Sequence, residues 1–154
     1  MPVPQGSKRV IRGNLIEMAD ARLRSWRQDI AAVSSQQMQG HLPWQGPVMV
    51  AISFYLPRPK AHYGTGKNSE RLKPQAPAYP ATHPDIDKLI RSVLDAMTGI
   101  VFHDDRQVVV IQAGKYYGQP GMDCQVAETV ASAHDVEQQR EVADGQEQED
   151  QQPG

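Results

Sequence analysis

The segment HPDIDKLIRSVLDAMTGIVFHDDRQVVVI, residues 83–111, decides the predicted fold. Pro84 and Asp85 are typical of a helix N-terminus, where proline fits the first turn and an acid complements the helix dipole. The apolar residues that follow are spaced three and one apart, so they form one stripe along a helix. Thr98-Gly99 is expected to end this helix.

Two or three strands are predicted after this helix. Ile100-Val101-Phe102 is expected to be a short strand, with a turn at 103–106. Gln107 to Ala113 is expected to be a strand buried on both faces, because four aliphatic residues follow one another. Lys115–Gly121 is predicted to be a further turn, and the alternating residues 122–126 a last strand.

The segments before residue 83 complete the fold class. Residues 9–18 predict a small hairpin around Gly13-Asn14. Asp20 is expected to cap a helix that runs to about Gln39, and residues 48–56 alternate as in a half-buried strand. The order predicts an α+β domain: a small mixed, mostly antiparallel sheet with two helices packed on one face. In the first helix, apolar residues recur three and four residues apart, at Leu23, Trp26, Ile30 and Val33.

The net charge of −2 over 154 residues conceals two opposite parts. Residues 131–154 hold seven acidic residues and one basic residue, a net charge of −6, together with six glutamines. Residues 1–130 hold 15 basic and 11 acidic residues, a net charge of +4. We therefore predict a folded domain over 1–130, with an anionic partner, and a disordered acidic tail over 131–154.

Several classes of protein are excluded by composition and motif. No apolar run approaches the roughly 20 residues that span a bilayer, and the N-terminus lacks the apolar centre of a secretion signal. We expect a soluble, cytoplasmic protein without a membrane partner. The single cysteine, Cys124, is expected to be a small apolar residue in a strand and not a catalytic thiol. Motifs of nucleotide hydrolases, serine esterases and zinc proteases are absent.

A long irregular stretch, 57–83, carries a net charge of +4, from five basic residues and Glu70. One interpretation is a floppy insertion; the other, which we favour, is a mobile basic arm that closes on nucleic acid. The arginines of the first helix, at 22, 24 and 27, are open to a similar choice between a solvated helix face and contacts to phosphates.

Two acidic clusters are the candidate catalytic residues. Asp85 and Asp87 lie where the second helix begins, and Asp104-Asp105 lies in the turn after it. Taken separately, they are an ordinary helix cap and an ordinary turn. If the chain folds back so that they meet, three or four carboxylates would share a small volume and require a hard cation, Mg²⁺ or Mn²⁺. His83 and His103 adjoin the clusters and are expected to be turn or supporting residues.

The same segment resembles the signature of RusA-type Holliday junction resolvases, roughly K-P-D-x-D-N-L-x-K-x-x-x-D-A-L-x-G-x-x-x-x-D-D-x-Q-V followed by a strand and a Lys-aromatic turn. The N-terminal PVPQGSKR and the segment from Leu56 to Lys60 resemble other parts of that family, so the likeness covers about residues 2–130. The matching positions in the signature are Pro84, Asp85, Asp87, Leu89, Asp95, Ala96, Gly99, Asp104, Asp105, Gln107, Val108 and Lys115.

This resemblance implies a homodimeric, Mg²⁺-dependent endodeoxyribonuclease that cuts branched DNA in recombination and repair, in a bacterium or a phage-infected cell. Mn²⁺ is expected to substitute for Mg²⁺. The essential metal-binding carboxylates would be Asp85, Asp87 and Asp105, with Asp104 of lesser weight. The family's catalytic lysine falls on Arg91, which keeps the positive charge but cannot deprotonate. Lys88 stands where the family usually has asparagine, and His83 where lysine is common.

Three functions remain open at this point: a junction resolvase, a nuclease of the same fold acting on other branched DNA, or a non-catalytic DNA-binding dimer. Retention of all four aspartates favours the first two. A C₂ dimer would present two identical sites to a four-way junction, which is itself nearly two-fold symmetric. We assign DNA contacts to the basic residues Lys8, Arg9, Arg58, Lys60, Lys67, Arg71, Lys73, Lys88 and Lys115.

Overall fold

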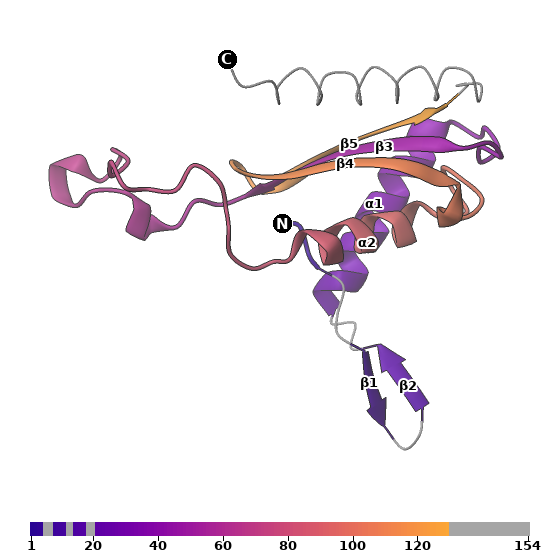
Figure 1. Ribbon diagram of the computed structural model, residues 1–154, viewed down its shortest axis with the longest axis horizontal. Coiled ribbons are helices and arrows are strands. Elements are labelled where there is room, and N and C mark those ends of the chain that lie inside the picture. Colours follow the sequence, from indigo (N-terminus) through magenta and orange to yellow (C-terminus); the bar gives the residue numbers. More distant parts are fainter. Residues whose placement is uncertain (5–7, 12–13, 18–20, 130–154) are drawn as a thin grey trace, which may run out of the picture.

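A computed structural model of the chain describes residues 1–4, 8–11, 14–17 and 21–129. Two helices cover one face of a three-stranded sheet, so the predicted α+β class is confirmed (Figure 1). The predicted acidic tail, 131–154, lies outside the described residues. So do Asp20, the predicted helix cap, and Gly13 of the predicted turn.

The sheet is mixed, with β3 (Val48–Leu56) at its centre. β3 pairs in parallel with β4 (Val108–Tyr117) and antiparallel with β5 (Gly121–Glu128). The parallel pair is joined through the second helix, as a parallel connection requires. β1 (Lys8–Ile11) and β2 (Asn14–Glu17) form a separate antiparallel hairpin, which confirms the predicted one.

The core lies between β3 and the two helices. The predicted alternation along β3 is confirmed, because Val48, Val50, Ile52, Phe54 and Leu56 are all buried, the first four of them in the core with the helices. The apolar stripe of α2 (Ile86–Met97) supplies the opposite wall of this core. Its fully buried members are Leu89, Val93 and Met97. The other face of the sheet carries neither helix (Figure 1).

The first helix, α1 (Ala21–Met38), packs on the core less completely than predicted. Leu23 and Ile30 are buried and Trp26 and Met38 pack against the core, but Val33 is 58% exposed, so it does not belong to the core-facing side. An ion pair of 2.7 Å between Arg27 and Asp95 ties α1 to α2. Neither of these helices, nor any other described one, has the length and apolarity to cross a membrane.

Three predictions after α2 are wrong. Residues 100–101 lie in a tight turn, in which Gly99 donates to the carbonyl of Phe102 and adopts a φ of +79°, and Phe102 forms only isolated β-bridges, to Trp44 and Thr98, instead of a strand. β4 continues to Tyr117, so only 118–120 remains as a turn. The aliphatic run in β4 is not buried on both faces: Val109, Val110 and Ile111 are 57%, 46% and 43% exposed. β4 is an edge strand, which leaves them open.

Cys124 lies on the helix-facing side of β5, beside Met97. Burial raises the pKa of its thiol to about 11, so the side chain is neutral at physiological pH. A neutral, half-buried thiol is a poor nucleophile, which agrees with the expected apolar role.

The segment between β3 and α2, residues 57–83, projects beyond the end of the sheet and is called the arm below (Figure 1). It has a structure of its own. Short 3₁₀ turns lie at Lys60–His62 and Gly66–Asn68, and Tyr63 and Leu72 form a β-bridge. Lys73 Nζ donates to the carbonyl of Ala61 at 2.8 Å, which holds the two sides of the arm together.

Candidate functional site

The first acidic cluster lies at the N-terminus of α2. Asp85 occupies the N-cap position, and Asp87 follows in the first turn; both are exposed. Lys88 Nζ donates to Asp85 Oδ2 at 2.7 Å, and His83 Nδ1 lies 3.9 Å from Asp85 Oδ1. The ammonium of Lys88 lowers the pKa of Asp85, so this carboxylate stays ionised.

Lys115 positions the segment that leads into this cluster. Its Nζ donates to the carbonyls of Thr82 and Pro84, each at 2.8 Å. The end of β4 is thereby joined to the residue just before Asp85. Lys115 is among the basic residues assigned to DNA contacts from the sequence. In the structure, its ammonium instead hydrogen-bonds the backbone just before the acidic cluster.

The second acidic cluster forms a capped 3₁₀ turn, Asp105–Gln107. Asp104 Oδ1 accepts from the backbone N–H of Arg106 at 3.0 Å, and this bond is the main cause of the lowered pKa of Asp104. The Asp104 side chain therefore stabilises the turn, whereas the side chain of Asp105, the next residue, is exposed to solvent.

Gln107 anchors this second turn, a role that the sequence reasoning did not assign. Its side-chain oxygen accepts from the backbone N–H of Asp104 at 2.8 Å. Its amide donates to the carbonyls of Trp44 and Gly46 at 2.9 and 2.8 Å. The only sequence signal was the glutamine of the D-D-x-Q-V motif, because hydrogen bonds to a loop some sixty residues away leave no local pattern.

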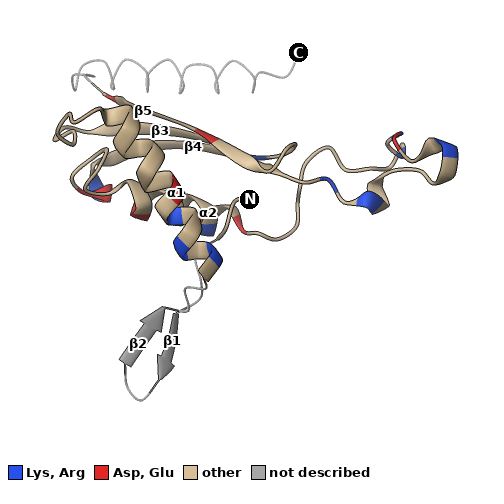
Figure 2. Cartoon of the chain, turned by 180° about the vertical axis from the view of Figure 1, so that it is seen from behind, with Lys and Arg blue, Asp and Glu red and all other residues tan. Residues whose placement is uncertain are grey.

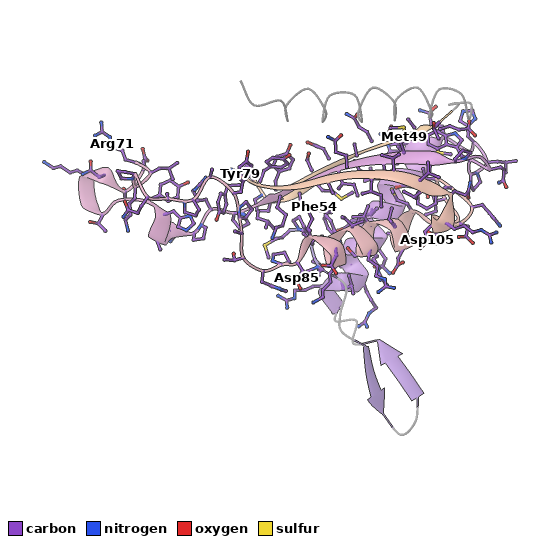
Figure 3. The ribbon with its side chains drawn as sticks, in the orientation of Figure 1. Met49, Phe54, Arg71, Tyr79, Asp85 and Asp105 are labelled. Atoms are coloured by element: carbon purple, nitrogen blue, oxygen red, sulfur yellow. The ribbon has the colours of Figure 1, made fainter. Side chains whose placement is uncertain are left out.

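The two clusters do not meet within one chain, so the convergence considered from the sequence is wrong. Figure 3 shows Asp85 and Asp105 at opposite ends of α2. This helix has 12 residues and is therefore about 18 Å long. Ligands of one Mg²⁺ ion lie roughly 2 Å from it. In the described part of the chain, no three His, Cys, Asp or Glu side chains form a group that could hold a metal ion.

Each cluster nevertheless has the right donors for a hard cation. Mg²⁺ is commonly held by one or two carboxylates together with water and substrate phosphate. Asp85 and Asp87, exposed at one turn, match that donor set in type and number. Asp105, at the other turn, offers a further carboxylate.

Arg91 lies one helical turn after Asp87 and Lys88 and is exposed. Asp87 and Asp95 lie four residues before and after it, so a surface ion pair with them would be the alternative to a catalytic role. Asp95 forms its ion pair with Arg27 instead. No hydrogen bond or ion pair joins Arg91 to another described residue. Its guanidinium is therefore open to an external anion.

Basic residues also lie at a distance from the acidic clusters, along the arm (Figure 2). On the arm, Lys60, Lys67 and Arg71 are exposed, whereas Arg58 and Lys73 donate to arm carbonyls. Lys8 and Arg9 lie on β1, whose side chains are outside the described part of the structure. Exposed cations thus lie on the arm and beside Asp87, and also at Arg22 and Arg24 on α1 and at Arg106 in the second acidic turn.

The protein is thus an α+β protein with exposed carboxylates at two turns and a basic surface nearby. Carboxylates can hold a metal ion and basic side chains can bind phosphates, so this combination is typical of proteins that hydrolyse phosphodiesters. A family model described as Endodeoxyribonuclease RusA matches residues 1–127. The chain is also 32% identical over 136 residues to "Uncharacterized protein YqaN" of Bacillus subtilis (strain 168), covering 84% of this chain and 92% of that protein. The chain belongs to the RusA endodeoxyribonuclease family, and is thus a nuclease of the hydrolase class.

Proposed function

We propose that this protein is a Mg²⁺-dependent homodimer that resolves four-way DNA junctions by paired phosphodiester hydrolysis. The observation that carries the proposal is the pair of exposed carboxylate turns at the two ends of α2, with Arg91 exposed between them. Mg²⁺ held by these carboxylates would polarise the phosphoryl oxygen and activate a water. Membership of an endodeoxyribonuclease family supports DNA as the substrate.

A dimer would bring together the carboxylates that one chain keeps apart. In a C₂ pair, any contact between the two ends of α2 is made twice, once at each of two equivalent places. Asp85 and Asp87 of one copy would then face Asp104 and Asp105 of the other. The dimer would have two such composite sites, which suits a substrate in which two strands have to be cut.

The exposed edge of β4 is the surface that we propose for this dimer. An apolar edge strand readily pairs with another chain, and Val109–Ile111 are the exposed aliphatic residues of β4. If two β4 strands pair antiparallel about Val110, Val108 of one copy lies opposite Gln112 of the other, and the 3₁₀ turn that precedes β4 extends toward Lys115 of the other copy. Lys115 holds the segment that precedes Asp85, so this register places the two kinds of acidic turn side by side.

Val110→Glu should weaken the dimer roughly tenfold or more, because it sets two like charges directly opposite each other across the paired strands. Sedimentation equilibrium over a range of concentrations measures the effect. Val33→Glu is the matched control, since Val33 is also an exposed valine (58%, against 46% for Val110) but lies on α1, away from β4. Equal dimer affinity of both variants would remove β4 from the interface.

The proposed activity is tested by a nicking assay on synthetic four-way, flap and linear duplex DNA, with Mg²⁺ and with EDTA. Paired, Mg²⁺-dependent cuts on the four-way junction are expected. Preferred cutting of flaps would instead support a nuclease of the same fold with another branched substrate. Binding to junctions without any cut, in Mg²⁺ or Mn²⁺, would support a non-catalytic DNA-binding dimer.

Deleting residues 131–154 should leave a folded, active protein that binds DNA more tightly at equal salt. The family match ends at residue 127, before this segment, and the deletion removes a net charge of −6. Thermal melting, cleavage and junction affinity at several salt concentrations measure the outcome. A full-length control carries amides at the seven acidic positions and should bind equally tightly. Weaker binding by the truncated chain would contradict the prediction.

A further inference from the structure

Three tyrosines gather on the open face of the sheet, where the arm begins. Tyr55 belongs to β3 and Tyr116 to β4, and their ring centroids are 6.0 Å apart. Tyr79, on the returning side of the arm, lies with its centroid 6.2 Å from that of Tyr116 (Figure 3). Tyr79 is 64% exposed and Tyr116 40% exposed. The three rings, Tyr55, Tyr79 and Tyr116, are called the tyrosine platform.

Two glycines of β4 and its following turn make room for the platform. A Cβ atom on Gly114 would lie 2.5 Å from the hydroxyl oxygen of Tyr116, so this ring lies over the glycine. A Cβ atom on Gly118 would come within 3.1 Å of Tyr55 Cδ1. The segment A-G-K-Y-Y-G therefore seats both rings close against the sheet.

The base of the arm fixes Tyr79 beside the other two rings. Arg58 stacks on Tyr117, with its guanidinium carbon 3.9 Å from the ring centroid, and donates to the carbonyl of Pro77 at 2.8 Å. These contacts hold the returning side of the arm two residues before Tyr79. The next residue, Pro80, is buried. Tyr79 is thus exposed on an anchored segment.

We propose that the tyrosine platform stacks an unpaired nucleobase of the branched DNA; this inference rests on the proposed function. Aromatic rings stack on any base, since every base has a π-face. Hydrogen bonding to Asp123 raises the pKa of the Tyr55 hydroxyl, and this neighbouring carboxylate disfavours a phosphate but not a neutral base. Phosphates further along the same strand would meet the exposed cations of the arm, Lys60, Lys67 and Arg71, of which Arg71 lies at the outer end of the arm (Figure 3).

A purely structural role is the competing explanation, because an aromatic ring over a glycine also stabilises a strand at a sheet edge. That role accounts for Tyr116 over Gly114. It does not account for Tyr79, which comes from the arm and leaves most of its surface in solvent. The test therefore uses Tyr79.

The experiment measures binding of the full-length protein, in EDTA, to a forked DNA with unpaired nucleotides at the branch. Tyr79→Ala should weaken this binding roughly tenfold, in keeping with the loss of one base–aromatic stack. Tyr79→Phe is the matched control and should bind like the wild type, because the ring remains. On fully paired duplex both variants should bind like the wild type. Thermal melting checks that both are folded.

Abasic nucleotides at the unpaired positions complete the test, since they keep the phosphates and remove the bases. The wild type should lose the same roughly tenfold on this DNA, and Tyr79→Ala should lose nothing further. The stacking proposal would be overturned if the losses of affinity from Tyr79→Ala and from the abasic DNA were additive. It would also be overturned if Tyr79→Phe lost as much affinity as Tyr79→Ala. If the wild type fails to bind or cut any branched DNA, the proposed function itself fails, which is a separate outcome.

Discussion

Replacing Asp85, Asp87 or Asp105 with asparagine should abolish cleavage of a four-way junction, a loss of roughly 10³-fold or more. Each change removes a negative ligand for the cation but keeps the size of the side chain. Junction binding should stay intact or become tighter, because one charge that repels the phosphates is gone. Single-turnover cleavage at saturating protein, together with binding in EDTA, measures both effects.

Asp95→Asn is the matched control for these variants. Asp95 lies on the same helix and is partly exposed, but its carboxylate pairs with Arg27 at 2.7 Å. This variant should cut at the wild-type rate and lose at most a small amount of stability, as is usual for surface ion pairs. Near-normal cutting by any one of the three asparagine variants would remove that residue from the site.

Mixing the Asp85→Asn and Asp105→Asn variants tests whether two chains share each site. A mixed dimer with composite sites has one site in which Asp85 and Asp105 are both intact and one in which both are changed. With random mixing, half of the dimers are mixed, so about a quarter of the sites should be active. These dimers should nick one strand without making paired cuts. If the mixture stays inactive, both residues act within one chain or the dimer does not exchange.

Two further measurements resolve that last case. Refolding the two variants together from denaturant forces exchange, and native mass spectrometry of variants that carry different tags counts the mixed dimers. Activity that appears only with mixed dimers supports the composite site. Mixed dimers without activity would contradict it and return the carboxylates to a single chain.

Arg91→Ala should reduce cleavage by the order of 10²-fold, as for removal of one group that stabilises the transition state. Its guanidinium is exposed one turn from Asp87, with no ion pair to another described residue. It is therefore placed to meet a scissile phosphate bound at the acidic turn. Arg91→Lys should retain substantial activity, because lysine is the residue that the family resemblance predicts there.

Lys88→Ala is the comparison for Arg91→Ala and should cost less cleavage. Lys88 donates to Asp85 at 2.7 Å, so its ammonium is already paired with a carboxylate and is less available to a phosphate than Arg91. Single-turnover rates separate chemistry from binding, and thermal melting should show only a small change for both variants. If Arg91→Ala cuts as fast as the wild type, Arg91 has no catalytic part.

Local pattern was sufficient to predict the main elements. The period-two alternation of residues 48–56 identified β3 and its buried face, since successive side chains of a strand point to opposite sides. The stripe after Asp85 identified α2 and its N-terminus for the equivalent helical reason. Edge and centre were not distinguished, however: the aliphatic run of β4 suggested a strand covered on both faces, but the described sheet leaves it at an edge.

The candidate site divides in the same way. The sequence by itself determined which residues are available: four aspartates at two turns, a cation at position 91, and a basic segment between β3 and α2. These follow from residue identity and short-range spacing. Only the tertiary structure decided their distance, because the rigid 12-residue α2 separates the two turns. It also decided that Lys115 and Gln107 hold those turns in place and that Tyr79 joins Tyr116, since such contacts join residues that the fold, and not the sequence spacing, makes neighbours.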